Sequence, residues 1–348
     1  MRGAKKTGLV VCPGRGTYNK DELGYLKRHH GDKAELIAAI DDYRRAQGQD
    51  PVSDLDGRAR YSLADFSRGD NASPLIYACA YADFLSIDHG AFDIVAVTGN
   101  SMGWYIALAC AGAAGPMAAL EIVNTMGSLM QEALIGGQLI YPLVDADWRA
   151  VPGRRAELEE LMARIDGQAG CALYSSIELG GFLVFGGNDK GLAALEKALP
   201  PEQDRFPLRL ANHAAFHTPL QTPIAERGQA LLGPELFQAP YLPLIDGRGR
   251  IWTPHASDPA ALRAYTLGHQ VVAPYDFTRA LQVGMKEFAP DAVILLGPGS
   301  SLGGPTAQAL IAIGWHGLAG KADFIARQTE DPLILSMGME EQRRAVVG

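Results

Sequence analysis

The segment Asp93–Ala111 reads DIVAVTGNSMGWYIALACA and carries the clearest structural signal in the chain. The segment Asp93–Val97, apolar from Ile94 on, predicts a short buried strand, and Gly103–Ala111 predicts a helix. Between them, G-N-S-M-G places Ser101 at a sharp strand-to-helix turn, where the flanking glycines let the backbones approach closely. Free N–H groups at a helix start can also stabilise an oxyanion. Ser101 is therefore a candidate nucleophile.

The same pattern occurs a second time, in Gly299-Ser300-Ser301-Leu302-Gly303. Ser301 also follows a predicted strand, Ala292–Leu296. However, Gly297-Pro298-Gly299 lengthens the turn, and Pro305 lies within the helix that would follow. Ser101, whose predicted helix contains no proline, is the better candidate.

Strands alternate with helices on both sides of the Ser101 segment. Gly8–Cys12 reads as another buried strand and leads into a glycine-rich turn. The predicted helices are Asp32–Gln47, Ser73–Leu85, Pro116–Leu134, Asp258–Leu267 and Asp276–Phe288. This alternation predicts an α/β protein whose mostly parallel sheet is covered by helices on both faces.

The middle of the chain has a different element order. The predicted elements are strand Gln138–Val144, helix Arg154–Ile165, strands Ala172–Ser176 and Phe182–Phe185, helix Asp189–Leu199 and strand Arg205–Leu210. This β-α-β-β-α-β order is typical of a ferredoxin-like domain. We therefore expect an inserted small domain over residues 137–210. A hydrolase-like large α/β domain would then comprise residues 1–136 and 211–348.

The composition excludes several classes of protein. Of the 348 residues, 47% are hydrophobic and 20% are charged, which excludes disordered and fibrous chains. The formal net charge of −8 argues against a nucleic-acid partner. The uncharged run Ile94–Leu120 is interrupted by Gly115-Pro116, so we expect a buried strand and helix there and no membrane span.

The four cysteines, Cys12, Cys79, Cys110 and Cys171, are far apart and form no C-x-x-C pair. This spacing implies neither a zinc site nor a disulfide framework, and it fits a cytoplasmic protein. No motif for a metal, nucleotide or flavin is present.

A serine nucleophile needs a base, and the chain has eight histidines. His29 and His30 lie in a charged stretch, so we expect both side chains to be exposed to solvent. His213 and His217 follow directly on the inserted segment, where the chain should return to the edge of the parent sheet. From the residues alone, either of these two can be the base.

Several stretches together resemble motifs of the malonyl-CoA:acyl-carrier-protein transacylase family, which includes the acyltransferase domains of fatty-acid and polyketide synthases. CPGRGTY at Cys12–Tyr18 resembles the family's FPGQGSQ, and GNSMGWYIAL at Gly99–Leu108 resembles GHSLGEYSAL. MQEA at Met130–Ala133 matches a stretch that follows the family's carboxylate-binding arginine. AFHTPL at Ala215–Leu220 resembles the segment around the catalytic histidine, and LGPG at Leu296–Gly299 resembles VGPG.

The resemblance implies an acyl transfer in two half-reactions. Ser101 would attack an acyl-thioester with His217 as general base, and the acyl group would pass to the phosphopantetheine thiol of an acyl carrier protein. The backbone N–H groups of Arg15 and Met102 would hold the oxyanion, and the backbone carbonyl near Gln270 would orient the histidine. No permanently bound cofactor is implied, because acyl-CoA or a phosphopantetheinyl carrier acts as substrate.

The sequence departs from the family where the acyl group would bind. Met126 stands where the family has its carboxylate-binding arginine, and a methionine cannot pair with a malonyl carboxylate. We therefore expect a neutral acyl group, unless Arg15 holds the carboxylate. Asn100 replaces the family's histidine and Trp104 its glutamate, so both join Met126 as candidate acyl-pocket residues; packing alone is the other interpretation of Met126 and Trp104.

The stretch Ser300–Gln308 lacks the basic residues that the family often has there. Contacts with an acidic carrier would then need arginines elsewhere, such as Arg205 and Arg209. Two other functions stay open: an acyl-thioester hydrolase on the same scaffold, and a carrier-docking protein without catalytic activity.

Overall fold

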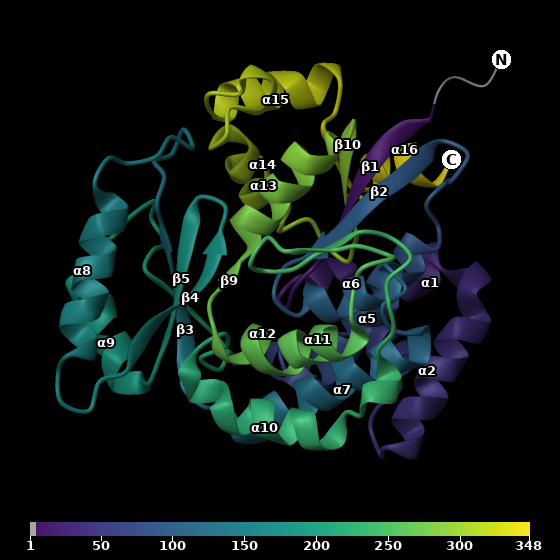
Figure 1. The fold of residues 1–348 in the computed structure, drawn as a ribbon, viewed down its shortest axis with the longest axis horizontal. Helices are drawn as coiled ribbons and strands as arrows, with labels where there is room; N and C mark the ends of the chain where they lie inside the picture. Colours follow the sequence, from purple (N-terminus) through teal and green to yellow (C-terminus); the bar gives the residue numbers. More distant parts are fainter. Residues whose placement is uncertain (1–4) are drawn as a thin grey trace.

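The computed structural model describes residues 5–348 and contains two β-sheets (Figure 1). The larger sheet has the strand order β11-β10-β1-β2-β7-β8. Its strands are β1 (Lys6–Cys12), β2 (Phe92–Gly99), β7 (Leu244–Ile245), β8 (Ile251–Trp252), β10 (Ala292–Leu295) and β11 (Ile334–Ser336). Neighbouring strands pair in parallel except β7 and β8, which pair antiparallel. The mostly parallel sheet that the sequence predicted is therefore present.

Helices cover both faces of this sheet, with α5 and α6 on one side and α13 and α14 on the other (Figure 1). The longer helices of this part are α2 (Ala34–Ala46), α5 (Gly69–Phe84), α6 (Gly103–Cys110), α7 (Pro116–Ala133), α10 (Thr222–Leu231), α13 (Phe277–Phe288), α14 (Gly303–Ile311), α15 (Lys321–Glu330) and α16 (Glu340–Val347). The short helices are α1 (Tyr25–His29), α3 (Val52–Asp56), α4 (Leu63–Phe66), α11 (Pro259–Ala264) and α12 (Gln270–Val272). Residues 9–12 of β1 are fully buried, as a strand covered on both faces must be.

The second sheet has the order β6-β3-β5-β4-β9. Residues 137–210, called the inserted segment below, supply β3 (Gly137–Pro142), α8 (Arg154–Asp166), β4 (Leu173–Leu179), β5 (Phe182–Gly187), α9 (Asp189–Ala198) and β6 (Leu208–Leu210). This is the element order that the sequence predicted, and the segment has a hydrophobic cluster of its own. The edge strand β9 (Tyr275–Asp276) comes from outside the segment and pairs with β4 in parallel.

Several predicted elements have different bounds in the structure. The strand expected over Arg205–Leu210 shortens to β6, because Pro207 has no N–H to donate to a strand ladder. The helix expected over Asp258–Leu267 becomes α11, followed by a π-helical turn over Tyr265–His269. This turn leads directly into α12, which carries Gln270.

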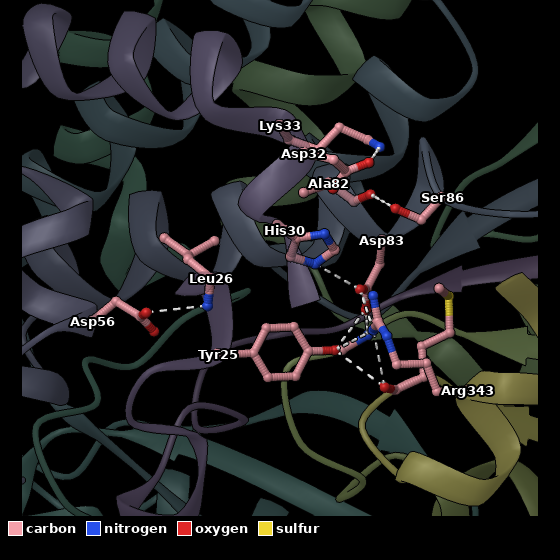
Figure 2. Close-up of polar contacts among 12 residues, drawn as sticks. Tyr25, Leu26, His30, Asp32, Lys33, Asp56, Ala82, Asp83, Ser86 and Arg343 are labelled. Atoms are coloured by element: carbon pink, nitrogen blue, oxygen red, sulfur yellow. Dashed lines mark hydrogen bonds and ion pairs between the residues drawn. The ribbon is translucent and has the colours of Figure 1, made fainter. Parts of the chain in front are cut away.

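A buried ionic cluster connects helix α16 with α5 and α1 (Figure 2). The Asp83 carboxylate, on α5, accepts hydrogen bonds from the Tyr25 hydroxyl at 2.8 Å, the Gly297 N–H at 2.7 Å and the Arg343 guanidinium at 2.5 Å. His30 Nε2 lies 2.9 Å from the same carboxylate, and both side chains are fully buried. The expectation that His30 is exposed is therefore wrong, because its partner lies on a distant helix and removes it from solvent.

Among residues 5–348, no helix is long and apolar enough to cross a bilayer.

Candidate active site

Ser101 lies in the turn between β2 and α6, in the left-handed backbone conformation with φ of +55°. A Cβ atom at Gly99 would lie 2.3 Å from the Gly103 carbonyl oxygen, and one at Gly103 would lie 2.3 Å from the Cys12 carbonyl oxygen. No side chain fits at either distance, so both positions require glycine. The pattern G-x-S-x-G thus forms the tight strand-to-helix turn that the sequence predicted.

His217 is the histidine that meets this serine. Its Nε2 lies 2.7 Å from Ser101 Oγ, and its Nδ1 lies 2.6 Å from the Gln270 carbonyl oxygen. A carbonyl only accepts hydrogen bonds, so Nδ1 carries the proton and Nε2 is free to accept the serine hydroxyl. His213, the other candidate base, instead contacts the side chain of Gln138 at 2.8 Å.

Burial lowers the pKa of His217 to about 4, although its hydrogen bond to the Gln270 carbonyl opposes this shift. The imidazole is therefore neutral at physiological pH and ready to accept a proton. A general base in this state needs no carboxylate partner to hold its tautomer, because the Gln270 carbonyl already does so.

This pKa predicts an unusual pH profile for the reaction of Ser101 with a probe. The rate of Ser101 labelling by a fluorophosphonate probe should rise as the pH increases through about 4 and then stay constant. Between pH 5.5 and 7.5 the rate should change less than twofold, whereas a base with the ordinary pKa of ~6.5 would lose about tenfold at pH 5.5. Circular dichroism at each pH serves as the control for folding. A tenfold loss at pH 5.5 with the fold intact would contradict the prediction.

The residues predicted to form the oxyanion hole lie where the turn after β1 packs on residues Gly99–Gly103, which are called the nucleophile turn below. A Cβ at Gly14 would lie 2.8 Å from the Asn100 carbonyl oxygen, so the two turns are in direct contact. Within residues 5–348, neither the Arg15 nor the Met102 N–H donates to another backbone group. These are the two N–H groups that the family resemblance assigned to the oxyanion.

The side chain of Gln270 adds a contact that the sequence did not predict. Its Nε2 donates to the Ser101 carbonyl at 3.1 Å, and its Oε1 accepts from the Tyr105 hydroxyl at 2.9 Å. Gln270 therefore fixes the base through its backbone and the nucleophile turn through its side chain. Tyr105 could have been suspected from its position one helical turn after Ser101.

The three candidate acyl-pocket residues lie in different surroundings. Trp104 is fully buried, and its indole N–H donates to Thr266 Oγ1 at 3.0 Å, so it is a core residue and does not line the cleft described next. Met126 is also fully buried and packs against Gly228, where a Cβ would lie 2.7 Å from the methionine sulfur. Asn100, by contrast, lines the cleft.

A cleft of about 780 Å³ lies between the inserted segment and the nucleophile turn. Its apolar wall comes mainly from the inserted segment and includes Ile140, Leu179, Phe182, Phe206, Leu208 and Leu210. Its charged lining residues are Arg15, Asp204, Arg205 and Lys321. The second candidate serine, Ser301, also lines this cleft, but among residues 5–348 it is Ser101 that bonds a histidine.

Arg15 forms no ion pair with an acidic side chain among residues 5–348. Its guanidinium donates to the Ser67 and Asn212 carbonyls and lies 5.2 Å from the centre of the Phe216 ring. Its Nε is buried and bonds to nothing within the described residues. Burial lowers the pKa of Arg15 to about 10, so the side chain stays charged.

The two arginines proposed for carrier contacts differ in their partners within the described part of the protein. Arg209 forms an ion pair with Asp189, whereas Arg205 lies over the Phe206 ring at the cleft. Among residues 5–348, no group of three acidic, cysteine or histidine side chains is placed to hold a metal ion.

The chain matches no protein-family model, and no curated protein matches it by sequence. Solved structures with the same fold are similar over nearly the whole chain. A malonyl-CoA:acyl carrier protein transacylase from Xanthomonas oryzae is 18% identical, with a TM-score of 0.75 over 99% of this chain and 98% of that one. An acyl-carrier-protein S-malonyltransferase from Burkholderia pseudomallei is 21% identical, with a TM-score of 0.73 over 98% and 99%.

A third similar structure is a complex of a type II PKS acyl-carrier protein with its malonyl-transacylase. It is 19% identical, with a TM-score of 0.69 over 88% of this chain and 93% of that one. These likenesses show that the chain has the fold of these enzymes.

Proposed function

Since this chain has the fold of malonyl-CoA:acyl-carrier-protein transacylases, we propose that it is an acyltransferase that loads an acyl carrier protein. The observation that carries this proposal is the arrangement of Ser101, His217 and Gln270. The 2.7 Å contact from Ser101 Oγ to His217 Nε2 and the 2.6 Å contact from Nδ1 to the Gln270 carbonyl form a nucleophile, a base and an orienting group.

In the first half-reaction, Ser101 Oγ attacks the thioester carbonyl carbon as its proton passes to His217 Nε2. The carbon–sulfur bond breaks, and the leaving thiolate takes that proton from His217. In the second half-reaction, the phosphopantetheine thiol gives its proton to His217 and its sulfur attacks the acyl-serine ester. Ser101 leaves with the proton, and the Arg15 and Met102 N–H groups hold the oxyanion in both steps.

The acyl group in this proposal is uncharged. At the position of the family's carboxylate-binding arginine, Met126 is fully buried against Gly228 and offers no hydrogen-bond donor. A carboxylate buried beside it without a partner costs about 3–5 kcal/mol, which is about 100-fold or more in rate. Acetyl and longer neutral acyl groups avoid this cost.

The acceptor is a phosphopantetheinyl carrier protein, as in the type II PKS complex with the same fold. The donor is a coenzyme A thioester or another carrier, and the reaction needs no bound cofactor. We place it in the cytoplasm, where the four free cysteines stay reduced. Arg205, at the edge of the cleft, is the cation we assign to the acidic carrier.

Intact-protein mass spectrometry tests this function. The protein is incubated with acetyl-CoA, a longer acyl-CoA or malonyl-CoA, and a holo carrier protein is then added. We expect a mass gain from the neutral donors, at least about 100-fold faster than from malonyl-CoA. The gain should be absent in Ser101→Ala, present in Ser301→Ala, and passed on to the carrier.

Other outcomes would change the assignment. Fast labelling by malonyl-CoA would contradict the neutral acyl group and favour Arg15, a charged residue that lines the cleft, as the carboxylate partner. An adduct that is released as free acid without loading the carrier would indicate an acyl-thioester hydrolase. A lack of adduct from every donor, including acyl carriers, would contradict catalysis at Ser101.

A further inference from the structure

The loop that carries His217 is held in a costly conformation. Both Asn212 and His217 have a φ of +56°, in the left-handed region that side chains rarely adopt. A non-glycine residue stays in this region only when surrounding contacts hold it there. The contacts around residues 212–218 therefore determine where the imidazole of His217 lies.

A hydrogen-bond network formed by two residues of the inserted segment contacts this loop at two points. The Ser176 hydroxyl donates to the Phe216 carbonyl at 2.7 Å, and Gln138 Nε2 donates to Ser176 Oγ at 2.7 Å. The Gln138 Oε1 accepts from His213 Nδ1 at 2.8 Å. This hydrogen-bond network begins at His213 and ends at Phe216, so both of its ends lie on the loop that carries His217.

Each group in this network has one possible role. The Phe216 carbonyl only accepts, so the single hydroxyl proton of Ser176 points to it and the amide of Gln138 donates to Ser176. Burial, together with the nearby charge of Arg15, lowers the pKa of His213 to about 3. His213 is therefore neutral at physiological pH and keeps its proton on Nδ1, facing Gln138.

The inserted segment also approaches the loop through its backbone. Gln138 lies on β3 and Ser176 on β4, and both strands pair with β5. A Cβ at Gly186, on β5, would lie 2.7 Å from the Thr218 methyl group, which requires glycine there. Three adjacent strands of the inserted segment thus contact residues 213–218.

Other contacts of the loop act on its flanks. The Ala215 N–H donates to the Ile135 carbonyl at 2.8 Å, and Thr218 Oγ1 donates to the Ala215 carbonyl at 2.7 Å. Neither contact reaches the Phe216 carbonyl, which belongs to the peptide unit directly before His217. Ser176 alone supplies its side-chain partner among the described residues.

We propose that Gln138 and Ser176 are positioning residues, which hold the His217 imidazole at hydrogen-bond distance from Ser101 by fixing the peptide unit before it. This inference rests on the proposed function, because it assigns these residues to the same nucleophile and base. The inserted segment then has two roles. It lines the cleft, and it positions the imidazole of His217.

The test compares Ser176→Ala, Gln138→Met and the double variant with the wild type. Three quantities are measured: the rate of Ser101 labelling by a fluorophosphonate, kcat and KM for acyl transfer, and the melting temperature. Tyr141→Phe is the matched control, because Tyr141 lies on β3 with Gln138 but faces the other way and donates to the Pro200 carbonyl at 2.9 Å. Tyr141→Phe also loses one hydrogen bond to a backbone carbonyl, and that bond is partly buried.

We expect Ser176→Ala to lower the labelling rate and kcat by about 10- to 100-fold, with KM changed less than about twofold, since a small displacement of a catalytic group has this effect. The double variant should lose no more than Ser176→Ala, because the two residues act as one unit. Tyr141→Phe should label at the wild-type rate. Should Ser176→Ala not fold, Gln138→Met, which keeps the side-chain volume, provides the test.

The outcomes separate the two proposals. A wild-type protein that the probe does not label at Ser101 would overturn the proposed function. A labelled wild type with Ser176→Ala or Gln138→Met reacting at the same rate would overturn the positioning role alone. An equal loss in Tyr141→Phe would overturn it too, because it would reveal a general effect of weakening the inserted segment.

Discussion

Replacing His217 with glutamine is expected to slow the acylation of Ser101 by about 10³- to 10⁴-fold. The glutamine amide can still reach the serine, but it cannot take up the proton that Ser101 loses when it attacks. The neutral imidazole, with its pKa lowered to about 4 and Nε2 at 2.7 Å from Ser101 Oγ, is the proton acceptor in the proposed mechanism. Rapid-quench mass spectrometry of the acyl-enzyme measures the effect.

The exposed His255 provides the control for this substitution. His255→Gln removes a histidine from the surface and should leave the acylation rate unchanged. If His217→Gln retained more than about a tenth of the wild-type rate, another group would be the base, and the assignment of His217 would be wrong.

Replacing Arg343 with methionine is expected to lower the free energy of unfolding by about 3–5 kcal/mol. The Arg343 guanidinium donates to the fully buried Asp83 carboxylate at 2.5 Å. Without it, the buried carboxylate charge keeps its neutral hydrogen-bond donors but loses its ion pair with Arg343. Chemical denaturation measures the change, and the loss should appear as a lower midpoint at an unchanged slope.

Arg344 is a matched control on the same helix. It is exposed and pairs with Glu340 across one helical turn, so Arg344→Met should cost less than about 0.5 kcal/mol. Equal losses in the two variants would mean that the C-terminal helix responds to any substitution. The buried cluster of Figure 2 would then have no special weight in stability.

Local patterns in the sequence were sufficient to predict the nucleophile turn. The five residues Gly99–Gly103 meet each other directly, and the glycine positions are fixed by contacts within the turn and with β1. The alternation of strands and helices likewise predicted the mostly parallel sheet, because the buried strands contain apolar runs such as Leu9–Val11. Choosing His217 over His213 required the family resemblance, since both histidines lie in the same short segment.

Contacts between distant parts of the chain could not be predicted in this way. Trp104 is a core residue because Thr266, 162 positions further along, accepts its indole N–H. His30 has charged neighbours in sequence, yet it is buried against Asp83. Ser176 and Gln138 lie in predicted strands, and only the folded loop supplies their partners. Polar residues without a local partner carry no periodic signal.

The contact between the inserted segment and residues 213–216 limits how this scaffold can be recombined. A chimera that received residues 137–210 from another protein would replace Ser176, which donates to the Phe216 carbonyl, and would change the support of the His217 loop. Successful crossover points should therefore keep β3, β4 and the His217 loop from a single parent. Specificity and rate are then inherited together, because one block of sequence encodes both the cleft wall and the support of the base.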